Sequence, residues 1–316
     1  MTTIARNTAL IPLSAADRLF GWRDHAALWL SLGVGLLVMQ VGAYLVPALG
    51  TKAALAAIVG GSVIGAGLLA WTAKIGCDSG LSSAGLMHAA YGSSFARLPV
   101  VLNIVQLIGW TTFELEVMRD GVLAIARQSG LLAPAVDAGA ATAGTGLPMP
   151  MVLVTLAFGA LLVALLMGTM VGLVRKFIGR FGLPLVILSL AWLSWQFLGK
   201  AQSMGWSAIW NRAGDGGMST LSALDLVIAM PISWLPLVAD FARHGRDGAS
   251  ALRGTWLGYA VANIWCYALG VLVALTTPST DLVAALLLAQ GGLVALGLIL
   301  IDEVDNAYGD LYSGSV

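Results

Sequence analysis

The residues best suited to chemistry form two polar stripes inside segments that are otherwise apolar. The first stripe consists of Asn103, Gln106, Trp110 and Glu114. Steps of three and four residues put these side chains on one face of a helix. The second stripe consists of Asp302 and Asn306, four residues apart, with Asp305 beside them. Glu303 points about 100° away from Asp302 around the same helix.

The stretch IGWTTFELEVMRDG holds two glutamates that differ in their surroundings. Glu116 precedes Arg119 by three residues, so an ion pair near the end of the helix accounts for it. Glu114 has no positive partner on its face, and a carboxylate buried without a cation tends to take up a proton. Glu114 is therefore a candidate proton carrier. For Asp302 and Asn306, hydrogen bonding between neighbouring helices is the alternative to a functional role.

The composition assigns these stripes to a membrane protein. Of the 316 residues, 59% are hydrophobic and only 10% are charged, whereas a soluble domain carries roughly a quarter of charged residues. The net charge is zero, which leaves no footprint for nucleic acid. Cys77 and Cys266 are isolated in the sequence, and no Cys/His pair has the spacing of metal ligands.

Apolar runs long enough to cross a bilayer predict an all-α protein with eight spans. The expected spans are 26–49, 53–74, 97–119, 149–171, 181–199, 221–241, 255–276 and 283–312. Unbroken runs such as MVLVTLAFGALLVALLMGTM exclude the alternation of a transmembrane β-barrel. With the N-terminus in the cytoplasm, eleven Lys and Arg residues fall inside and five outside, as the positive-inside rule requires. Residues 1–25 are then a cytoplasmic segment.

The sixth of the expected spans is interrupted. In AMPISWLPLVADFAR, Pro231 and Pro236 each remove a helical hydrogen bond, so the sixth span should break around Trp234 and line a cavity. A simple proline kink with a packed tryptophan is the alternative. The first span carries Gly33, Gly35 and Gln40, which are consistent with close packing or with a binding site.

The spacing of the unusual spans predicts an internal repeat. The first and sixth spans lie five apart in the series, and so do the third and eighth. Two five-helix repeats related by inversion would place these four spans around one central site.

Four stretches together resemble one transporter family. They are LFGWRDHAALWLSLGVG, YGSSFARLPVVLNIVQLIGW, DFAR (Asp240 to Arg243) and VDNAYGDLYS. The sequence is similar to the nucleobase:cation symporters, the permeases of purines, pyrimidines and hydantoins, and within them to hydroxymethylpyrimidine permeases. The resemblance implies a leucine-transporter-like inverted-repeat fold with alternating access. Because that family has twelve spans, we expect a truncated transporter domain (26–316), with a first repeat at 26–199 and an incomplete second repeat at 221–316.

The resemblance also implies a site. Trp110 and Trp234 match the aromatic residues that hold a flat heteroaromatic ring, and Gln40, Glu114, Asp302 and Asn306 are the expected polar contacts. A sodium region would involve Gly33, Gly35 and Gly297. Leu300 and Ile301 stand where sodium-coupled relatives have small or hydroxyl residues. That difference favours proton coupling through Glu114, Asp302 and Asp305, without any organic cofactor.

The expected function is import of hydroxymethylpyrimidine, a thiamine precursor, or a related pyrimidine by H⁺ or Na⁺ symport across a bacterial inner membrane. The expected partners are the substrate and the lipid bilayer, and the expected state is a monomer. The alternatives are a truncated fragment that transports nothing and a permease for cytosine or a hydantoin. An intramembrane enzyme is disfavoured, because GxSxG and HExxH are absent and the YGD at Tyr308 to Asp310 lacks a second Asp-bearing segment.

Overall fold

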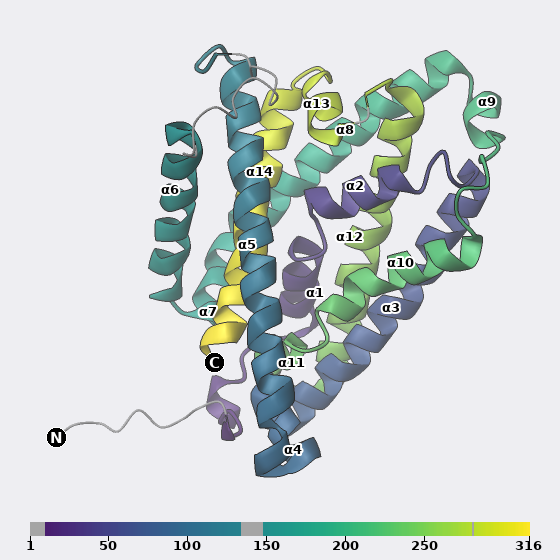
Figure 1. The fold of residues 1–316 in the computed structure, drawn as a ribbon. Coiled ribbons are helices and arrows are strands. Elements are labelled where there is room, and N and C mark those ends of the chain that lie inside the picture. Colours follow the sequence, from purple (N-terminus) through teal and green to yellow (C-terminus); the bar gives the residue numbers. More distant parts are fainter. Residues whose placement is uncertain (1–9, 134–147, 280) are drawn as a thin grey trace.

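The computed structural model describes residues 10–133, 148–279 and 281–316. Within these ranges the regular structure is helical, apart from one isolated bridge between Phe20 and Gly245 (Figure 1). The first half contains η2 (Ala15–Asp17), α1 (Trp22–Ser31), α2 (Leu36–Tyr44), α3 (Thr51–Ser79), α4 (Ser83–Phe95), α5 (Arg97–Gln128) and α6 (Met149–Leu166). The second half contains α7 (Met170–Gly172), η3 (Leu173–Gly182), α8 (Leu183–Met204), α9 (Trp206–Trp210), α10 (Thr220–Ser233), α11 (Val238–Ala242), α12 (Gly248–Thr276), α13 (Leu282–Leu287) and α14 (Gly292–Ser315).

Five helices of the described chain are long and apolar enough to cross a membrane, and the bent pair α1–α2 makes a sixth. The five are α3, α5, α6, the continuous run α7–α8 and α12. The two remaining predicted spans are each divided. The segment 221–241 is two helices, α10 and α11, as the predicted break requires, whereas the segment 283–312, predicted as one span, contains most of the short helix α13 and most of α14. Four acidic residues interrupt the apolar surface of α14, namely Asp302, Glu303, Asp305 and Asp310.

The break predicted for the sixth span is present, and the first span is interrupted as well. Residues 32–35 separate α1 from α2, which are bent by 61°. Residues 234–237 separate α10 from α11. Pro231 lies inside α10 and Pro236 in the break, where neither can donate a backbone hydrogen bond. Each broken span therefore leaves backbone groups that other side chains must satisfy.

Helix α12 is the centre of one half of the molecule, since it packs against α1, α2, α3 and α8. Glycines make this close packing feasible. A Cβ atom at Gly254 or Gly258 would collide with backbone of α1, and one at Gly270 with backbone of α2. Small residues at helix contacts are typical of packing inside membranes. The helices α1–α2, α3, α10–α11 and α12 thus form one group.

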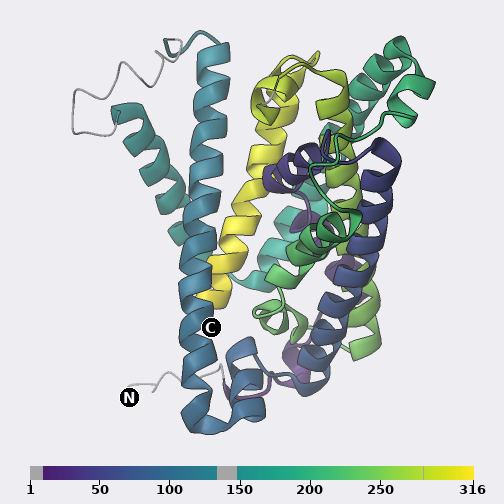
Figure 2. The same cartoon turned by 45° about the vertical axis from the view of Figure 1, so that its right-hand side comes forward.

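Helices α5 and α14 form the other side of the molecule. They pack along each other, and α6 packs against α5 on the outside (Figures 1 and 2). The polar stripes of α5 and α14 therefore face the two broken spans. This arrangement brings the four unusual segments around one centre, as the inverted repeat predicts.

Candidate functional site

A small cavity lies where the two broken spans meet α5, α12 and α14. Its volume is about 40 Å³, which is room for a few water molecules. The lining residues are Leu32, Val34, Gly35, Leu37, Val38, Trp110, Glu114, Met230, Ser233, Trp234, Leu237, Tyr259, Glu303, Asn306 and Asp310. Four residues predicted for the site are therefore brought together: Trp110, Glu114, Trp234 and Asn306.

The stripe on α5 serves both the broken sixth span and the cavity. The Asn103 side-chain amide donates to the Pro236 carbonyl oxygen at 3.3 Å, and that of Gln106 donates to the Ser233 carbonyl oxygen at 2.8 Å. These two acceptors belong to the end of α10 and the break after it. Further along the same face, Trp110 and Glu114 reach the cavity. The polar stripe on α5 therefore donates to carbonyl groups at the break and lines the cavity beside it.

Helix α14 performs the same service for the broken first span. The backbone N–H of Leu36, the first residue of α2, donates to Glu303 Oε1 at 2.6 Å. The Asn306 side-chain amide donates to the Val34 carbonyl oxygen at 3.0 Å and contacts Glu303 Oε2 at 3.4 Å. A carboxylate at a helix N-terminus is also favoured by the helix dipole. Glu303 and Asn306 therefore satisfy the backbone groups that the α1–α2 break exposes.

The cavity is acidic. Glu114 from α5 and Glu303 from α14 both line it, and Asp310 lines the same space. No Lys, Arg or His is among the described residues of the lining. Two carboxylates that line so small a cavity repel each other away from water, so such a pair is more stable when it holds a proton.

Aromatic rings flank the cavity from two sides. Trp110 enters from α5 and Trp234 from the break after α10. Trp234 is fixed by an edge contact with Trp29, whose ring centroid is 5.8 Å away. Trp29 also contacts Phe241 and Tyr259 at 5.8 and 6.0 Å. These rings, of which Trp29, Phe241 and Tyr259 are buried and Trp234 is half-buried, form a packed layer beside the cavity, which we call the Trp29 cluster (Trp29, Trp234, Phe241 and Tyr259).

Asp302 does not line the cavity, although it was predicted as a polar contact of the substrate there. The Ser31 hydroxyl, at the end of α1, donates to Asp302 Oδ1 at 2.8 Å. Asp302 and Asp305 are 4% and 5% exposed, on the face of α14 turned towards α1. The helical period places Glu303, Asn306 and Asp310 on the cavity face instead, at steps of three and four residues.

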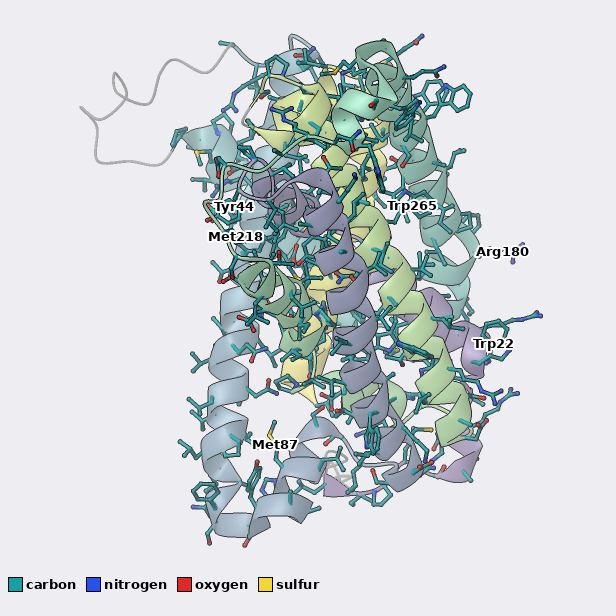
Figure 3. The ribbon with its side chains drawn as sticks, turned by 90° about the vertical axis from the view of Figure 1, so that its right-hand side faces the viewer. Trp22, Tyr44, Met87, Arg180, Met218 and Trp265 are labelled. Atoms are coloured by element: carbon teal, nitrogen blue, oxygen red, sulfur yellow. The ribbon has the colours of Figure 1, made fainter. Side chains whose placement is uncertain are left out.

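Gln40 and Gly297 also lie elsewhere. Gln40 is exposed and lines a separate surface pocket with Tyr44 and Asp215. Tyr44 marks the place of this pocket in Figure 3, where it lies far from Met87, towards the opposite end of the molecule. A Cβ atom at Gly297 would face Ile125 of α5. Gly33 packs against Ala262 of α12, while Gly35 borders the cavity next to Glu303. The three glycines of the expected sodium region are therefore not assembled around one point.

The prediction for Glu116 is confirmed. Its carboxylate accepts from Arg119 at 3.1 Å on the exposed side of α5. Glu114 and Glu116 therefore differ as expected, since one lines the cavity and the other belongs to a surface ion pair.

Side-chain contacts join α11 and the nearby His244 to the last turns of α14, which ends near the lower end of the molecule in Figure 1. Asp240 of α11 accepts from the Ser83 backbone N–H at 2.9 Å and from the Ser313 hydroxyl of α14. His244 Nε2 is 3.0 Å from the Tyr312 hydroxyl. Burial lowers the pKa of His244 to about 4, so this histidine is neutral at pH 7. These contacts tie the α11 segment to α14.

The sequence analysis did not predict that Glu303 and Asp310 line the cavity. It also did not predict that Ser31 and Asp240 form hydrogen bonds with α14. Glu303, Asn306 and Asp310 follow helical spacing, so the signal was present in the sequence. The competing stripe of Asp302 and Asn306 has equally good spacing, and the period alone does not say which stripe faces a cavity.

Comparisons with known proteins place this geometry in context. Residues 12–290 match the family model described as permease for cytosine/purines, uracil, thiamine and allantoin. No curated protein sequence matches the chain.

The fold is similar to that of Mhp1, a nucleobase-cation-symport-1 family transporter whose structure was solved in a closed conformation with bromovinylhydantoin bound. The TM-score is 0.69 at 15% sequence identity, and the match covers 98% of this chain. The chain spans 66% of the length of Mhp1. The two interrupted spans and the helices that support them are thus arranged as in a leucine-transporter-like fold, and the chain belongs to the permease family for cytosine/purines, uracil, thiamine and allantoin.

Proposed function

We propose that the chain is a secondary transporter that imports a small nucleobase-like heteroaromatic compound, hydroxymethylpyrimidine or a related pyrimidine. The observation that supports this most is the cavity between Trp110 and Trp234. Two indole rings can hold a flat ring between them, while Glu114 and Asn306 offer polar contacts to its heteroatoms. Membership of a permease family supports the same conclusion.

The cavity must enlarge for transport. Its volume of about 40 Å³ is well below the roughly 300–1,000 Å³ of typical ligand pockets. Alternating access supplies such a change, because α10–α11 and α1–α2 can move relative to α5 and α14. In this proposal the Asp240 and His244 contacts form the closed gate at the cytoplasmic end, and the membrane is a bacterial inner membrane.

Transport is coupled in this proposal to a cation, with H⁺ favoured over Na⁺. Buried carboxyl groups that can bind the coupling cation lie on two faces of α14. Glu114 and Glu303 line the cavity, Asp302 accepts from Ser31 at the end of α1, and Asp305 is buried as well. Intramembrane acids of this kind commonly bind the driving ion.

The test is uptake by the full chain reconstituted in proteoliposomes. Labelled hydroxymethylpyrimidine should accumulate when an inward proton gradient is imposed, and Asp302→Asn should bind the compound but fail to concentrate it. Accumulation driven by sodium alone would reassign the driving ion. Neither binding nor uptake of any pyrimidine would contradict the proposed function, whereas binding without uptake would identify a chain that recognises substrate but does not transport it.

A further inference from the structure

The unused hydrogen-bonding groups of the cavity are acceptors. Asn306 is 4% exposed, and its Oδ1 atom has no partner. Its amide nitrogen is already engaged with the Val34 carbonyl oxygen, which fixes the orientation of the side chain. Glu114 Oε2 is also buried without a partner. A ligand of this site must therefore offer N–H donors in at least two directions.

The donors that line the cavity near these atoms are largely committed. The Ser233 hydroxyl donates to the Met230 carbonyl oxygen at 2.7 Å. The backbone N–H of Leu36 donates to Glu303 Oε1. A proton held by the Glu114–Glu303 pair is thus the donor best placed to meet a ring nitrogen. The other titratable groups of the described lining are Asp310 on α14 and Tyr259 on α12, while Asp302 and Asp305 are buried outside this lining.

An amidine edge fits this arrangement. In such an edge an amino group stands beside an unprotonated ring nitrogen, as in a 4-aminopyrimidine. A carboxylic acid can donate its proton to the ring nitrogen while its second oxygen accepts from the amino group. When the proton transfers, the carboxyl O–H bond breaks and a ring N–H bond forms, which leaves an amidinium–carboxylate pair with two parallel hydrogen bonds. No other reactant is required.

A ring with a carbonyl group at the same place fits less well. The acid can donate to that oxygen and accept from the adjacent ring N–H, but this ring nitrogen already carries a hydrogen and cannot take the proton, and no second N–H remains for Asn306 Oδ1. Burying acceptors against one another without donors costs about 1–3 kcal/mol for each unsatisfied group. The cavity therefore discriminates by the number of donors on the edge of the ring.

We propose that the Glu114–Glu303 pair binds the amidine edge of an aminopyrimidine-type ring and passes its proton to the ring, so that substrate and proton cross together as one cation. This inference rests on the proposed function and deepens it. Asn306 Oδ1 accepts a further N–H of the same ligand. Glu303 connects this event to the fold, because its other oxygen holds the first N–H of α2.

The experiment uses two compounds that differ at one position, 4-amino-2-methylpyrimidine and 2-methylpyrimidin-4-one. Each competes with labelled hydroxymethylpyrimidine for the full-length protein in lipid nanodiscs. The amino compound should bind at least tenfold more tightly than the oxo compound. In Glu303→Gln this ratio should fall below threefold, because glutamine keeps an acceptor for Leu36 but carries no exchangeable acid proton.

Glu116→Gln, in the surface ion pair of the same helix as Glu114, is the matched control and should keep the wild-type ratio. Equal binding of both compounds to the wild-type protein would overturn the inference and leave the proposed function standing. A full ratio in Glu303→Gln would overturn the role of the carboxyl pair. Failure of the label itself to bind would contradict the proposed function instead. If Glu303→Gln does not fold, Glu114→Gln provides the second test, with the same expected loss of the ratio.

Discussion

Helices α5 and α14 perform the same structural task with different chemistry. Each supports the backbone of one interrupted span and then lines the cavity. On α5 the support comes from two neutral amides, Asn103 and Gln106. On α14 it comes from one amide, Asn306, and one carboxyl group, Glu303.

This difference between α5 and α14 determines which interrupted span can respond to a proton. An amide keeps the same hydrogen bonds at every physiological pH, so the α10–α11 break is insensitive to protonation. Glu303 changes charge when it gains a proton, and it holds the first N–H of α2 at a helix N-terminus, where negative charge is stabilising. Binding and proton transfer in the cavity should therefore move the α1–α2 side first.

The strongest change should be in substrate accumulation, when the cavity carboxyl group on α5 is replaced. In Glu114→Gln, the α5 side of the carboxyl pair cannot exchange a proton, so pH-driven accumulation of substrate should be lost. Glu116→Gln, two residues away on the exposed face, should accumulate substrate as the wild type does. Unchanged pH dependence in Glu114→Gln would rule out its role as a proton carrier. Uptake into proteoliposomes at several imposed pH gradients measures both.

The next effect concerns the two supporting amides. Gln106→Leu leaves the Ser233 carbonyl oxygen without its donor, and Asn306→Leu does the same to Val34. An unsatisfied buried group costs about 1–3 kcal/mol, so each variant should unfold at a lower temperature in detergent. Ser129→Ala, which removes an exposed hydroxyl from the end of α5, is the control and should change little. A loss in only one of the two variants would show that the two breaks are not supported alike.

A smaller effect is expected from the aromatic walls. Trp110→Ala removes ring stacking, which is worth about 0.5–1.5 kcal/mol beyond the buried area. That range corresponds to roughly twofold to thirteenfold weaker binding of a pyrimidine. Trp195→Ala removes an indole that is 73% exposed on α8 and should bind normally. Equal affinity of Trp110→Ala and wild type would place the substrate elsewhere.

The smallest effect separates the cavity from the contact between His244 and Tyr312. Burial lowers the pKa of His244 to about 4, against about 6.5 in an unfolded chain. The unfolded state therefore binds more protons between these values, and stability falls as the pH drops from about 6.5 to 4. In His244→Asn this part of the acid sensitivity should disappear, as thermal unfolding at a series of pH values would show. If wild type and His244→Asn lost the same stability between pH 6.5 and pH 4, the lowered pKa of His244 would be contradicted.

The sequence was informative where local chemistry decides the structure. Pro231 and Pro236 predicted the sixth-span break because proline cannot donate a hydrogen bond anywhere. The paired positions of the polar spans predicted which helices meet, and the surface pairing of Glu116 with Arg119 followed from their spacing. The fold similarity to Mhp1 confirms the leucine-transporter-like arrangement.

The sequence was less informative where tertiary contacts decide. The stripe of Asp302 and the stripe of Glu303 are equally regular, and only the contact of Ser31 with Asp302 turns the first towards α1. Gln40 is close to Gly35 in sequence, but the 61° bend between α1 and α2 carries it away from the cavity. The eighth span was predicted as one helix because α13 and α14 form a nearly continuous apolar segment.

The central claim is that the carboxyl group supplied by α14 gives the cavity its proton-dependent binding, and that the amides supplied by α5 do not. Affinity for labelled hydroxymethylpyrimidine, measured between pH 5.5 and pH 8.5, tests this most directly in wild type, Glu303→Gln and Gln106→Ala. The affinity should change with pH in wild type and in Gln106→Ala, although Gln106→Ala should bind more weakly at every pH. The affinity of Glu303→Gln should not change with pH. A wild-type pH profile in Glu303→Gln would contradict it.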